Sequence, residues 1–393
     1  MATASPLARL GSHPLLALGF RPFFLGAGAL ALLAMLVWLV RLWGLLPGDG
    51  YLGGTAWHAH EMLFGYVGAV IAGFLLTAAR NWTGIDTPTG LRLGALVLLW
   101  LAARLGPLLS LPHALLALLD LAFFPALAWA LIPPLWQGKN KVNRAFLALL
   151  AAMTLANLLV HAQALGLTAA TATRGSRLML DLTLLTLWLV AGRIMPFFTQ
   201  SAIPGCKPLT RPWVETGTFI LAPAIALINL AWPASPVGGV LLLVLAAVQA
   251  IRLAGWHDPR AWRNPMLAVL YAGYLWLILG LALDGLAVLD QLPPFPALHA
   301  LTAGGIGVFT LGMVARVTLG HTGRDMRASP ATSLAFVIIN LAALTRVFLP
   351  LLWPGHYHLW LGISGGLWVL AFALFLGIYG PMLIQPRVDG RPG

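Results

Sequence analysis

Residues 55–76, TAWHAHEMLFGYVGAVIAGFLL, carry the pattern that sets the fold class of this chain. The stretch opens with two histidines and a glutamate and then continues as an uninterrupted apolar run. A helix that crosses a bilayer needs about 20 mostly apolar residues, and this run has that length. The stretch therefore predicts a membrane-spanning helix with ionisable side chains at its beginning.

The composition of the whole chain agrees with this interpretation. Of its 393 residues, 60% are hydrophobic and only 9% are charged, and the mean hydropathy is +0.89. Soluble domains carry about 25% charged residues, so a soluble surface cannot be built from this composition. The chain is predicted to be an integral membrane protein.

Eleven further apolar runs resemble the first in length, and all are too long and continuous for the strands of a membrane barrel. No polar domain or linker interrupts them, which predicts one integral-membrane domain over residues 1–393. The fold class is all-α, a polytopic membrane helical bundle of about twelve transmembrane helices. The predicted spans are residues 22–43, 58–79, 91–111, 114–136, 143–165, 177–197, 214–233, 237–256, 265–287, 297–319, 331–352 and 358–380.

Lysine and arginine are concentrated in the loops that follow the even-numbered spans. Cytoplasmic loops of membrane proteins carry an excess of these residues, so the alternation predicts that both termini are cytoplasmic. Arg174 and Arg177, after the fifth span, depart from the pattern. The basic residues that agree with the alternation, because they come after even-numbered spans, are Arg80, Arg92, Lys139, Lys141, Arg144, Lys207, Arg211, Arg252, Arg260, Arg263, Arg316, Arg324, Arg327, Arg387 and Arg391.

Charge and cysteine content exclude several classes of function. Membrane topology explains the net charge of +12, so no nucleic-acid partner is predicted. The single cysteine, Cys206, cannot form a disulfide within the chain or build a thiolate metal cluster. Any bound metal must therefore use imidazole, carboxylate, thioether or an external ligand.

Four histidines are expected at one depth in the membrane. With a cytoplasmic N-terminus, His58 and His60 lie near the outer end of the second span, His161 near the outer end of the fifth and His299 near the outer end of the tenth. Ionisable groups at membrane depth suggest function, and neutral imidazole suits iron, copper and zinc. The sequence thus predicts metal ligation, against the alternative that each histidine hydrogen-bonds a carbonyl at the interface.

The spacing of the first two histidines restricts how they can act. Residues two apart on a helix point about 200° away from each other, so His58 and His60 require either an irregular backbone or two separate centres. Glu61 is predicted to carry protons or to support a ligand, and the alternative is a carboxylate that favours a helix N-terminus. Asn157, one turn before His161, could orient that histidine or a bound ligand.

Other residues allow two interpretations each. Glycines that follow His60 and His299 could let a flat macrocycle approach the backbone, or they could serve helix packing. Asp120 could be a relay residue or a polar contact within the bundle. Arg193 and Arg316, near cytoplasmic span ends, could bind a haem propionate or a quinol head group, or could reach toward the membrane surface.

Four motifs together resemble the NnrS family. Their order and spacing run from the first span through at least the tenth. They are GFRPFFLGA at residues 19–27, WHAHEMLFGYVGAVIAGFLLTAARNWTG at 57–84, GRIMPFFTQ at 192–200 and HALTAGGIGVFTLGMVARVTLGHTGR at 299–324.

The resemblance implies a multi-pass protein of the bacterial inner membrane that contains haem, of type b, and copper. It implies a role in nitric oxide metabolism, most simply reductive detoxification of nitric oxide to nitrous oxide with electrons from quinol. By motif match it carries functional roles to His58, His60, Glu61, His299, His321, Arg21, Arg193 and Arg316, with Glu61 as the candidate proton donor. His161 is added from topology alone.

Three other functions remain open. A relative of the haem–copper oxidases would also have histidines in the second and tenth spans, but here the sixth and seventh spans contain none. A second possibility is a protein that binds or senses nitric oxide without turnover. A third is a transporter of haem or metal, although such proteins favour broken helices and a site at the midplane. The sequence leaves the oligomeric state open.

Overall fold

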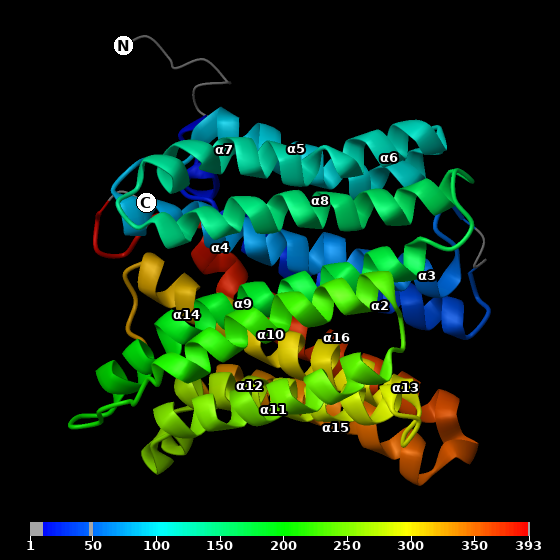
Figure 1. Ribbon diagram of the computed structural model, residues 1–393. Coiled ribbons are helices and arrows are strands. Elements are labelled where there is room, and N and C mark those ends of the chain that lie inside the picture. The colour runs from blue at the N-terminus through cyan, green and yellow to red at the C-terminus, as the bar shows by residue number, and fades with distance from the viewer. Residues whose placement is uncertain (1–10, 47–49, 392–393) are drawn as a thin grey trace. The chain divides into compact units, whose positions relative to one another are not determined.

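The computed structural model describes residues 11–46 and 50–391, and among these residues it contains helices and no strand. Twelve of the described helical segments are long and apolar enough to cross a membrane, which confirms the predicted helical bundle of a multi-pass membrane protein. Figure 1 shows these segments as long coiled ribbons joined by short loops. Only a helix can satisfy all its own backbone polar groups in lipid, which explains the uniform secondary structure.

The spans lie within a few residues of the predicted ranges. They cover Phe20–Leu42, Gly54–Thr83, Gly90–Leu109, His113–Gln137, Lys141–Ala164, Ala172–Ala202, Pro212–Ala231, Pro236–Trp256, Pro265–Val288, Pro294–His321, Pro330–Leu352 and Pro354–Ile384.

The chain divides into two compact units. Unit 1 contains Met1–Met179, Val317–Asp325 and Leu376–Gly393, and unit 2 contains Leu180–Arg316 and Met326–Phe375. The prediction of a single membrane domain stays a prediction, and each unit is described separately below.

Unit 1 contains the helices of the first five spans. They are η1 (Pro14–Leu16), α2 (Phe20–Leu42), α3 (Gly54–His60), η2 (Glu61–Val67), α4 (Gly68–Thr83), α5 (Gly90–Leu105), η3 (Gly106–Leu109), α6 (His113–Leu121), α7 (Phe123–Gln137), η4 (Lys141–Arg144) and α8 (Ala145–Ala164). Within it, α2 packs on α4 and η2, and α7 packs on α4 and α8.

The remaining helices belong wholly or mainly to unit 2, and α9, α14 and α16 each have some residues in unit 1. They are α9 (Ala172–Ala202), α10 (Pro212–Ala231), α11 (Pro236–Trp256), η5 (Pro259–Arg263), α12 (Pro265–Val288), α13 (Pro294–His299), η6 (Ala300–Val308), α14 (Phe309–His321), α15 (Pro330–Leu352), η7 (Pro354–His356) and α16 (Tyr357–Ile384). In this set α12 packs on α11 and η6, and η6 packs on α15.

Local sequence signals fix where several helices begin. Asn264 precedes Pro265 at the start of α12, and its side chain accepts a hydrogen bond from the Met266 N–H at 3.1 Å. Ser329 precedes Pro330 at the start of α15 and caps the Thr332 N–H in the same way. A capping side chain followed by proline is favourable because the first helical N–H groups have no partner within the helix.

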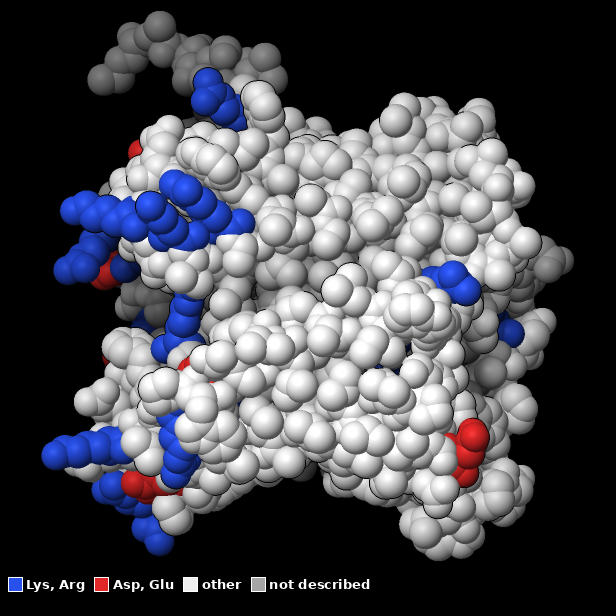
Figure 2. Space-filling model, viewed as in Figure 1, with Lys and Arg blue, Asp and Glu red and all other residues white. Residues whose placement is uncertain are grey.

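The helix flanks and the helix ends differ in chemistry. Large apolar side chains such as Leu98, Trp129 and Ile220 are exposed on the flanks of single helices, as lipid-facing surfaces require. On the face drawn in Figure 2, lysine and arginine gather at helix ends, and the flanks between them are free of charge over long stretches.

Two spans contain an unusual helical turn at a histidine. In the second span, the short helix α3 ends at His60 and is followed at once by η2, which is a π-helix. In the tenth span, α13 ends at His299 and is followed by the π-helix η6. Such π-turns are rare and occur frequently at functional sites, so they direct attention to the side chains around them.

Candidate metal centre

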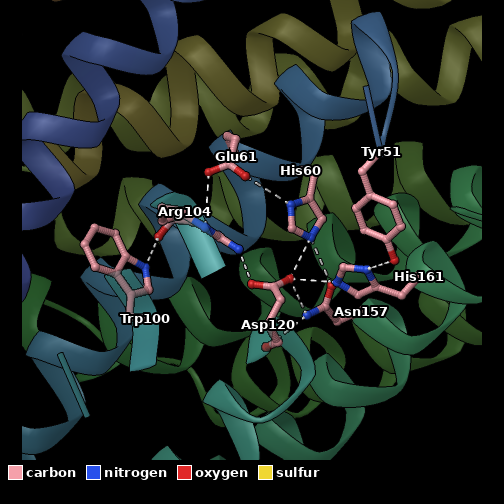
Figure 3. A network of polar contacts seen from close by, with 9 residues as sticks. Tyr51, His60, Glu61, Trp100, Arg104, Asp120, Asn157 and His161 are labelled. Carbon is pink, nitrogen blue, oxygen red and sulfur yellow. Dashed lines mark hydrogen bonds and ion pairs between the residues drawn. The ribbon is translucent and has the colours of Figure 1, made fainter. Parts of the chain in front are cut away.

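His60 is buried in the interior of unit 1. Its ring Nε2 lies 3.0 Å from Oδ2 of Asp120 in α6 and 3.1 Å from Oδ1 of Asn157 in α8. Figure 3 shows the ring at the centre of a polar network that joins these helices. The last turn of the short helix before η2 thus carries its histidine into the interior of the bundle.

Asp120 is the focus of this network, and one of its oxygens is shared by several side chains. Nε2 of His161 lies 2.8 Å from Oδ2 of Asp120, and Nδ2 of Asn157 donates to the same oxygen at 2.9 Å. Possible ligand atoms of His60, Asp120 and His161 all lie within 4.8 Å of one another, and all three residues are buried. These three side chains form a group that could hold a metal ion.

The second ring nitrogen of each histidine, Nδ1, also has a polar partner. Nδ1 of His60 lies 3.5 Å from Oε1 of Glu61, and Nδ1 of His161 lies 2.9 Å from the Tyr51 hydroxyl. Metal-binding histidines usually donate their second ring N–H to a carboxylate or another oxygen, which fixes the tautomer with the lone pair toward the metal. Both histidines have this arrangement, with Nε2 directed at the shared carboxylate.

Tyr51 lies just outside the second span and is half-buried. Burial raises the pKa of Tyr51 to about 12, and the negative charge of Asp120 acts in the same direction. The phenol therefore stays protonated at neutral pH and remains a neutral hydrogen-bonding partner of His161.

Arg104 in α5 joins the two acidic residues of the network. It pairs with Oδ1 of Asp120, and its Nε lies 3.3 Å from Oε2 of Glu61. All three side chains are almost fully buried. Two carboxylates against one guanidinium leave an excess negative charge when the histidines are neutral, and this excess favours a bound cation.

Gly65 in the π-helix η2 lies close to this arginine. A side chain at Gly65 would place its Cβ 2.9 Å from Nη1 of Arg104 and 3.0 Å from Oε2 of Glu61. The carbonyl of Gly65 accepts a hydrogen bond from the Trp100 indole N–H at 3.1 Å. Gly65 is therefore required by the close approach of Leu30, Arg104 and Glu61 to the backbone of η2.

The donor set matches a metal ion on chemical grounds. Two imidazole nitrogens and a carboxylate oxygen suit iron, copper or zinc. The same groups can also satisfy one another through hydrogen bonds, with N–H groups donating to Asp120. The two states differ in where the imidazole protons lie, because ligation needs the Nε2 lone pairs of His60 and His161.

His58 lies outside this network, although it is only two residues from His60. Its ring stacks on Trp38 of α2, with ring centroids 4.7 Å apart. The sequence spacing predicted that the two histidines would point in different directions. Of the four histidines expected at one depth, the structure brings His60 and His161 together, with ring centroids 5.4 Å apart.

His299 belongs to unit 2. Its Nδ1 donates to the Phe295 carbonyl one turn earlier at 2.8 Å. This bond places the proton on Nδ1, so Nε2 is the nitrogen that could ligate a metal. The predicted role of His299 in binding a cofactor stays a prediction.

Arg21 and His321 lie at the end of the chain's last helix, within unit 1. Nη1 of the buried Arg21 is 3.0 Å from the Leu383 carbonyl and 2.7 Å from the Gln385 carbonyl. A cation is favourable at a helix C-terminus, where carbonyl groups lack partners. The His321 ring packs on Phe20 at 5.5 Å, and its carbonyl accepts a hydrogen bond from Arg387. The structure gives both residues a role in holding the C-terminal segment.

Arg193 and Arg316 lie in unit 2. Arg193 is half-buried in α9, and the guanidinium of the buried Arg316 lies 3.9 Å from the centre of the Phe198 ring. The GRIMPFF motif thus supplies an aromatic partner for Arg316. Their predicted contact with a propionate or quinol stays a prediction.

The space beside the glycines that follow His60 and His299 is occupied by aromatic side chains of neighbouring helices. A Cβ on Gly68 would approach Phe124 at 3.3 Å, one on Gly304 would lie 2.5 Å from Trp276, and one on Gly307 would lie 2.6 Å from Trp368. These positions therefore serve close helix packing, and a flat macrocycle would have to lie elsewhere.

Sequence reasoning did not select three members of the network as ligands or partners. The sequence allows two interpretations of Asp120, a relay residue or a polar contact, and it gives no local signal for the role of Arg104 or Tyr51. A signal between spans was available, since Asp120 and Arg104 are charged residues within apolar runs and such residues pair with each other. For Asn157, the sequence suggested a role in orienting His161 or a bound ligand, and the structure shows it in contact with His60 and Asp120.

Comparison with known families gives a match over almost the whole chain. The model of the NnrS protein family matches residues 14–387, which include every element of the network. A comparison with curated proteins finds no match. The matched range confirms the resemblance carried by the four motifs, and the chain belongs to the NnrS family.

Proposed function

We propose that this protein is a membrane metalloprotein of nitric oxide metabolism, with a non-haem metal ion bound by His60, Asp120 and His161. Family membership suggests a metalloprotein related to nitric oxide. The observation that carries the proposal is the convergence of two imidazole Nε2 atoms, at 3.0 and 2.8 Å, on one oxygen of Asp120. Copper is the metal that the family resemblance favours, and the donor set suits it.

Each residue of the network has a distinct task in this proposal. His60, Asp120 and His161 would hold the metal, which would supply a binding position for nitric oxide and an electron-transfer centre. Glu61 and Tyr51 orient the two imidazoles through their Nδ1 atoms. Arg104 pairs with both carboxylates and holds them in place.

The burial of the network suits its proposed substrate. Nitric oxide is small and apolar, so it can enter from the lipid. Coupling of two nitric oxide molecules to nitrous oxide and water consumes two electrons and two protons. Glu61 remains our candidate for proton delivery, because it is a buried carboxylate in contact with His60. Electrons would come from membrane quinol, and haem b would complete the cofactor set.

The proposed setting is the bacterial inner membrane, with both termini in the cytoplasm. The support is the concentration of lysine and arginine in alternate loops. A protease-accessibility assay on a tag placed in the loop between α7 and α8 tests this orientation.

The first test measures metal content. Wild-type protein purified in detergent is compared by elemental analysis with Asp120→Asn and His161→Ala, and with His356→Ala as a control at an exposed histidine. We expect Asp120→Asn and His161→Ala to lose most of the non-haem metal, with a drop in affinity of at least about 100-fold. Equal metal content in all four proteins would rule out the site.

The second test separates catalysis from binding. Purified protein is supplied with nitric oxide and a reduced quinol, and nitrous oxide is measured by gas chromatography. Nitrous oxide that forms with wild type but not with Asp120→Asn supports the reductase. A spectral change on adding nitric oxide without nitrous oxide would instead identify a binding or sensing protein.

A further inference from the structure

Unit 1 has a groove on its surface between α5 and α7, two helices that lie side by side (Figure 1). The groove has a volume of about 1000 Å³ and is lined by residues from 90–99 of α5, by residues from 126–133 of α7 and by the loop before α5. Leu91 and Trp129 line it and are also exposed large apolar side chains. The groove therefore opens on the apolar flank of the helices, toward lipid.

The inner part of the groove is apolar. Ala95 of α5 and Ala126 and Ala130 of α7 are too small to fill the space between the helices, and Leu96 and Leu99 form its walls. None of these side chains carries a polar atom, so a polar group placed here would lose its hydrogen bonds to water. This part of the groove fits a hydrocarbon chain.

The mouth of the groove is formed by the loop between α4 and α5. The Thr87 hydroxyl in this loop is buried and donates to the Leu76 carbonyl at 2.7 Å. Gly90, at the start of α5, has a positive φ of 57°, and a Cβ there would lie 3.0 Å from the Gly11 carbonyl. The hydrogen bond of Thr87 holds the loop against α4, so the mouth is formed before any ligand binds.

The end of α7 lies close to the same loop. A Cβ on Gly138, just after α7, would lie 2.7 Å from Thr83, the last residue of α4. Trp136, in the last turn of α7, is exposed. Exposed tryptophans at span ends are typical of the membrane interface, where lipid head groups lie. The mouth of the groove is therefore expected at the depth of the head groups.

The mouth carries an excess of positive charge. Asp86 lines the groove, but it is paired with Arg80 at 2.9 Å. Arg92 also lines the groove, and its side chain has no hydrogen bond or ion pair to any residue that the structure describes. Lys139 and Lys141, which follow α7, have none either. Three cations near the mouth thus lack an acidic partner within the described chain.

The position of Arg92 along its helix adds to this imbalance. It lies in the first turn of α5, and this turn contains no acidic residue. The helix dipole disfavours a cation at a helix N-terminus, so Arg92 gains most from an anion bound beside it. Phosphate is such an anion, and arginine can bind it through two hydrogen bonds.

Trp129 lies between the mouth and the deepest part of the groove. It stands one turn before Pro133, and both residues line the groove. Its indole N–H has no hydrogen bond to a described residue. An indole N–H needs an acceptor where water is scarce, and the ester carbonyls of a phospholipid lie just below its phosphate. The groove thus presents cations, then a hydrogen-bond donor, then apolar walls.

We propose that the groove between α5 and α7 binds one acidic phospholipid, with its phosphate at Arg92 and one acyl chain over Ala95, Ala126 and Ala130. Basic pockets between transmembrane helices on the cytoplasmic side bind acidic head groups, and the predicted orientation places this mouth in the cytoplasm. A quinol has a similar tail but a neutral head group, so the unpaired cations favour the phospholipid. The inference is independent of the metal ion proposed above.

The experiment measures lipid binding to the full-length protein by native mass spectrometry. Delipidated protein in detergent is titrated with phosphatidylglycerol and, separately, with phosphatidylcholine that has the same acyl chains. We expect wild type to bind one phosphatidylglycerol at least about tenfold more tightly than phosphatidylcholine, because several basic residues contribute.

A pair of arginine variants tests the head-group contact. Arg92→Gln should lower the affinity for phosphatidylglycerol about fivefold, the contribution of one basic residue beside an acidic lipid, and leave the affinity for phosphatidylcholine unchanged. Arg327→Gln removes the same charge at an exposed arginine of unit 2 and is the matched control. It should bind phosphatidylglycerol as wild type does.

A second pair of variants tests the apolar part. Ala130→Trp places an indole inside the groove, whereas Leu98→Trp places one on an exposed flank of α5 that does not line it. We expect Ala130→Trp to lose the tightly bound phosphatidylglycerol and Leu98→Trp to keep it. Thermal unfolding without lipid shows that both variants are folded, since neither substitution is in the core of the bundle.

Equal affinities of Arg92→Gln and Arg327→Gln for phosphatidylglycerol, or of wild type for the two lipids, would overturn the proposal. Full competition by inorganic phosphate would do so as well, by identifying a site for a free anion. A short-chain quinol that binds more tightly than phosphatidylglycerol, with no effect of Arg92→Gln, would assign the groove to quinol. A mass of two chains that Ala130→Trp reduces to one would assign it to a second copy of this protein.

Discussion

Each unit of this protein buries a polar network, and the two networks differ in composition. In unit 1, two histidines converge on Asp120, and Arg104 joins Asp120 to Glu61. In unit 2, the side chain of Arg252 is only 1% exposed. It donates to Glu215 at 2.7 Å and to the Trp188 carbonyl at 3.1 Å.

The network of unit 2 continues through neutral groups. Arg252 contacts the Tyr274 hydroxyl, which donates to Gln249, and Gln249 donates to Thr218 at 3.0 Å. One guanidinium faces one carboxylate, so the charges balance within the network. No histidine takes part among the described residues, and this network therefore offers no imidazole lone pair to a metal.

The comparison teaches that burial of polar groups does not by itself identify a functional site. Both networks are rich in hydrogen bonds and ion pairs, and both connect several helices. The network of unit 1 differs because it has an excess carboxylate and two imidazoles that can exchange a proton for a metal. The network of unit 2 connects α9, α10, α11 and α12, and its composition is that of a contact that stabilises helix packing.

The largest expected effect comes from removing the arginine of each network. Arg104→Leu leaves two buried carboxylates without their partner, and Arg252→Leu leaves Glu215 alone. Breaking a buried ion pair from one side costs about 3–5 kcal/mol. We expect both variants to lose thermal stability in detergent. Added copper should restore Arg104→Leu, because a bound cation replaces the missing charge, and should leave Arg252→Leu unchanged.

Two results with these variants would contradict the distinction between the two networks. Equal restoration of both by copper would mean that the metal acts nonspecifically. Absence of restoration in Arg104→Leu would mean that the network of unit 1 is structural like that of unit 2. Thermal unfolding followed by tryptophan fluorescence, with and without a chelator, provides the measurement.

A smaller effect is expected from adding one methyl group to each π-helix. Gly65→Ala would push against Arg104 and Glu61, and Gly304→Ala would push against the Trp276 ring. Overpacking of this kind costs about 1–3 kcal/mol. Both variants should be less stable, but only Gly65→Ala should weaken binding of the non-haem metal. Titration of the metal-free protein with copper measures this difference, and equal affinities for the two variants would contradict it.

The smallest effect is expected at the hydroxyl groups that support each network. Tyr51→Phe removes the partner of His161 Nδ1, and loss of such a partner lowers metal affinity by about tenfold. Because the pKa of Tyr51 is raised to about 12 by burial, this decrease should be constant between pH 6 and 8. Tyr274→Phe is the matched control in unit 2. It should cost about 1 kcal/mol of stability and leave metal affinity unaltered, and a tenfold loss there would contradict the distinction.

The fold could be read from the sequence because the physics of lipid leaves few options. Apolar runs of this length must be helices, and the predicted ends of the spans lie within a few residues of those observed. The direction of His58 away from His60 also followed from helix geometry. The family followed from motifs that are long and specific.

The partners of His60 could not be predicted in the same way. Asp120 and Arg104 lie in spans that are apolar on all sides, so hydropathy does not specify which face of each helix turns inward. The direction of a ligand then depends on how neighbouring helices pack. Tyr51 lies in a loop before the second span, where sequence alone gives no position. The contacts of Arg21 with the end of α16 link residues far apart in the chain, which no local pattern records.

The π-helix η2 has a consequence for how the site can change through evolution or design. A π-turn is an α-helix that has gained one residue, and one residue corresponds to about 100° of rotation. Deleting a single residue within 61–67 would restore a continuous α-helix and swing His60 off Asp120, while the apolar length needed to cross the bilayer would hardly change. The direction of the His60 ring toward the bundle interior is thus set by one inserted position, which can be gained or lost without rebuilding the membrane fold.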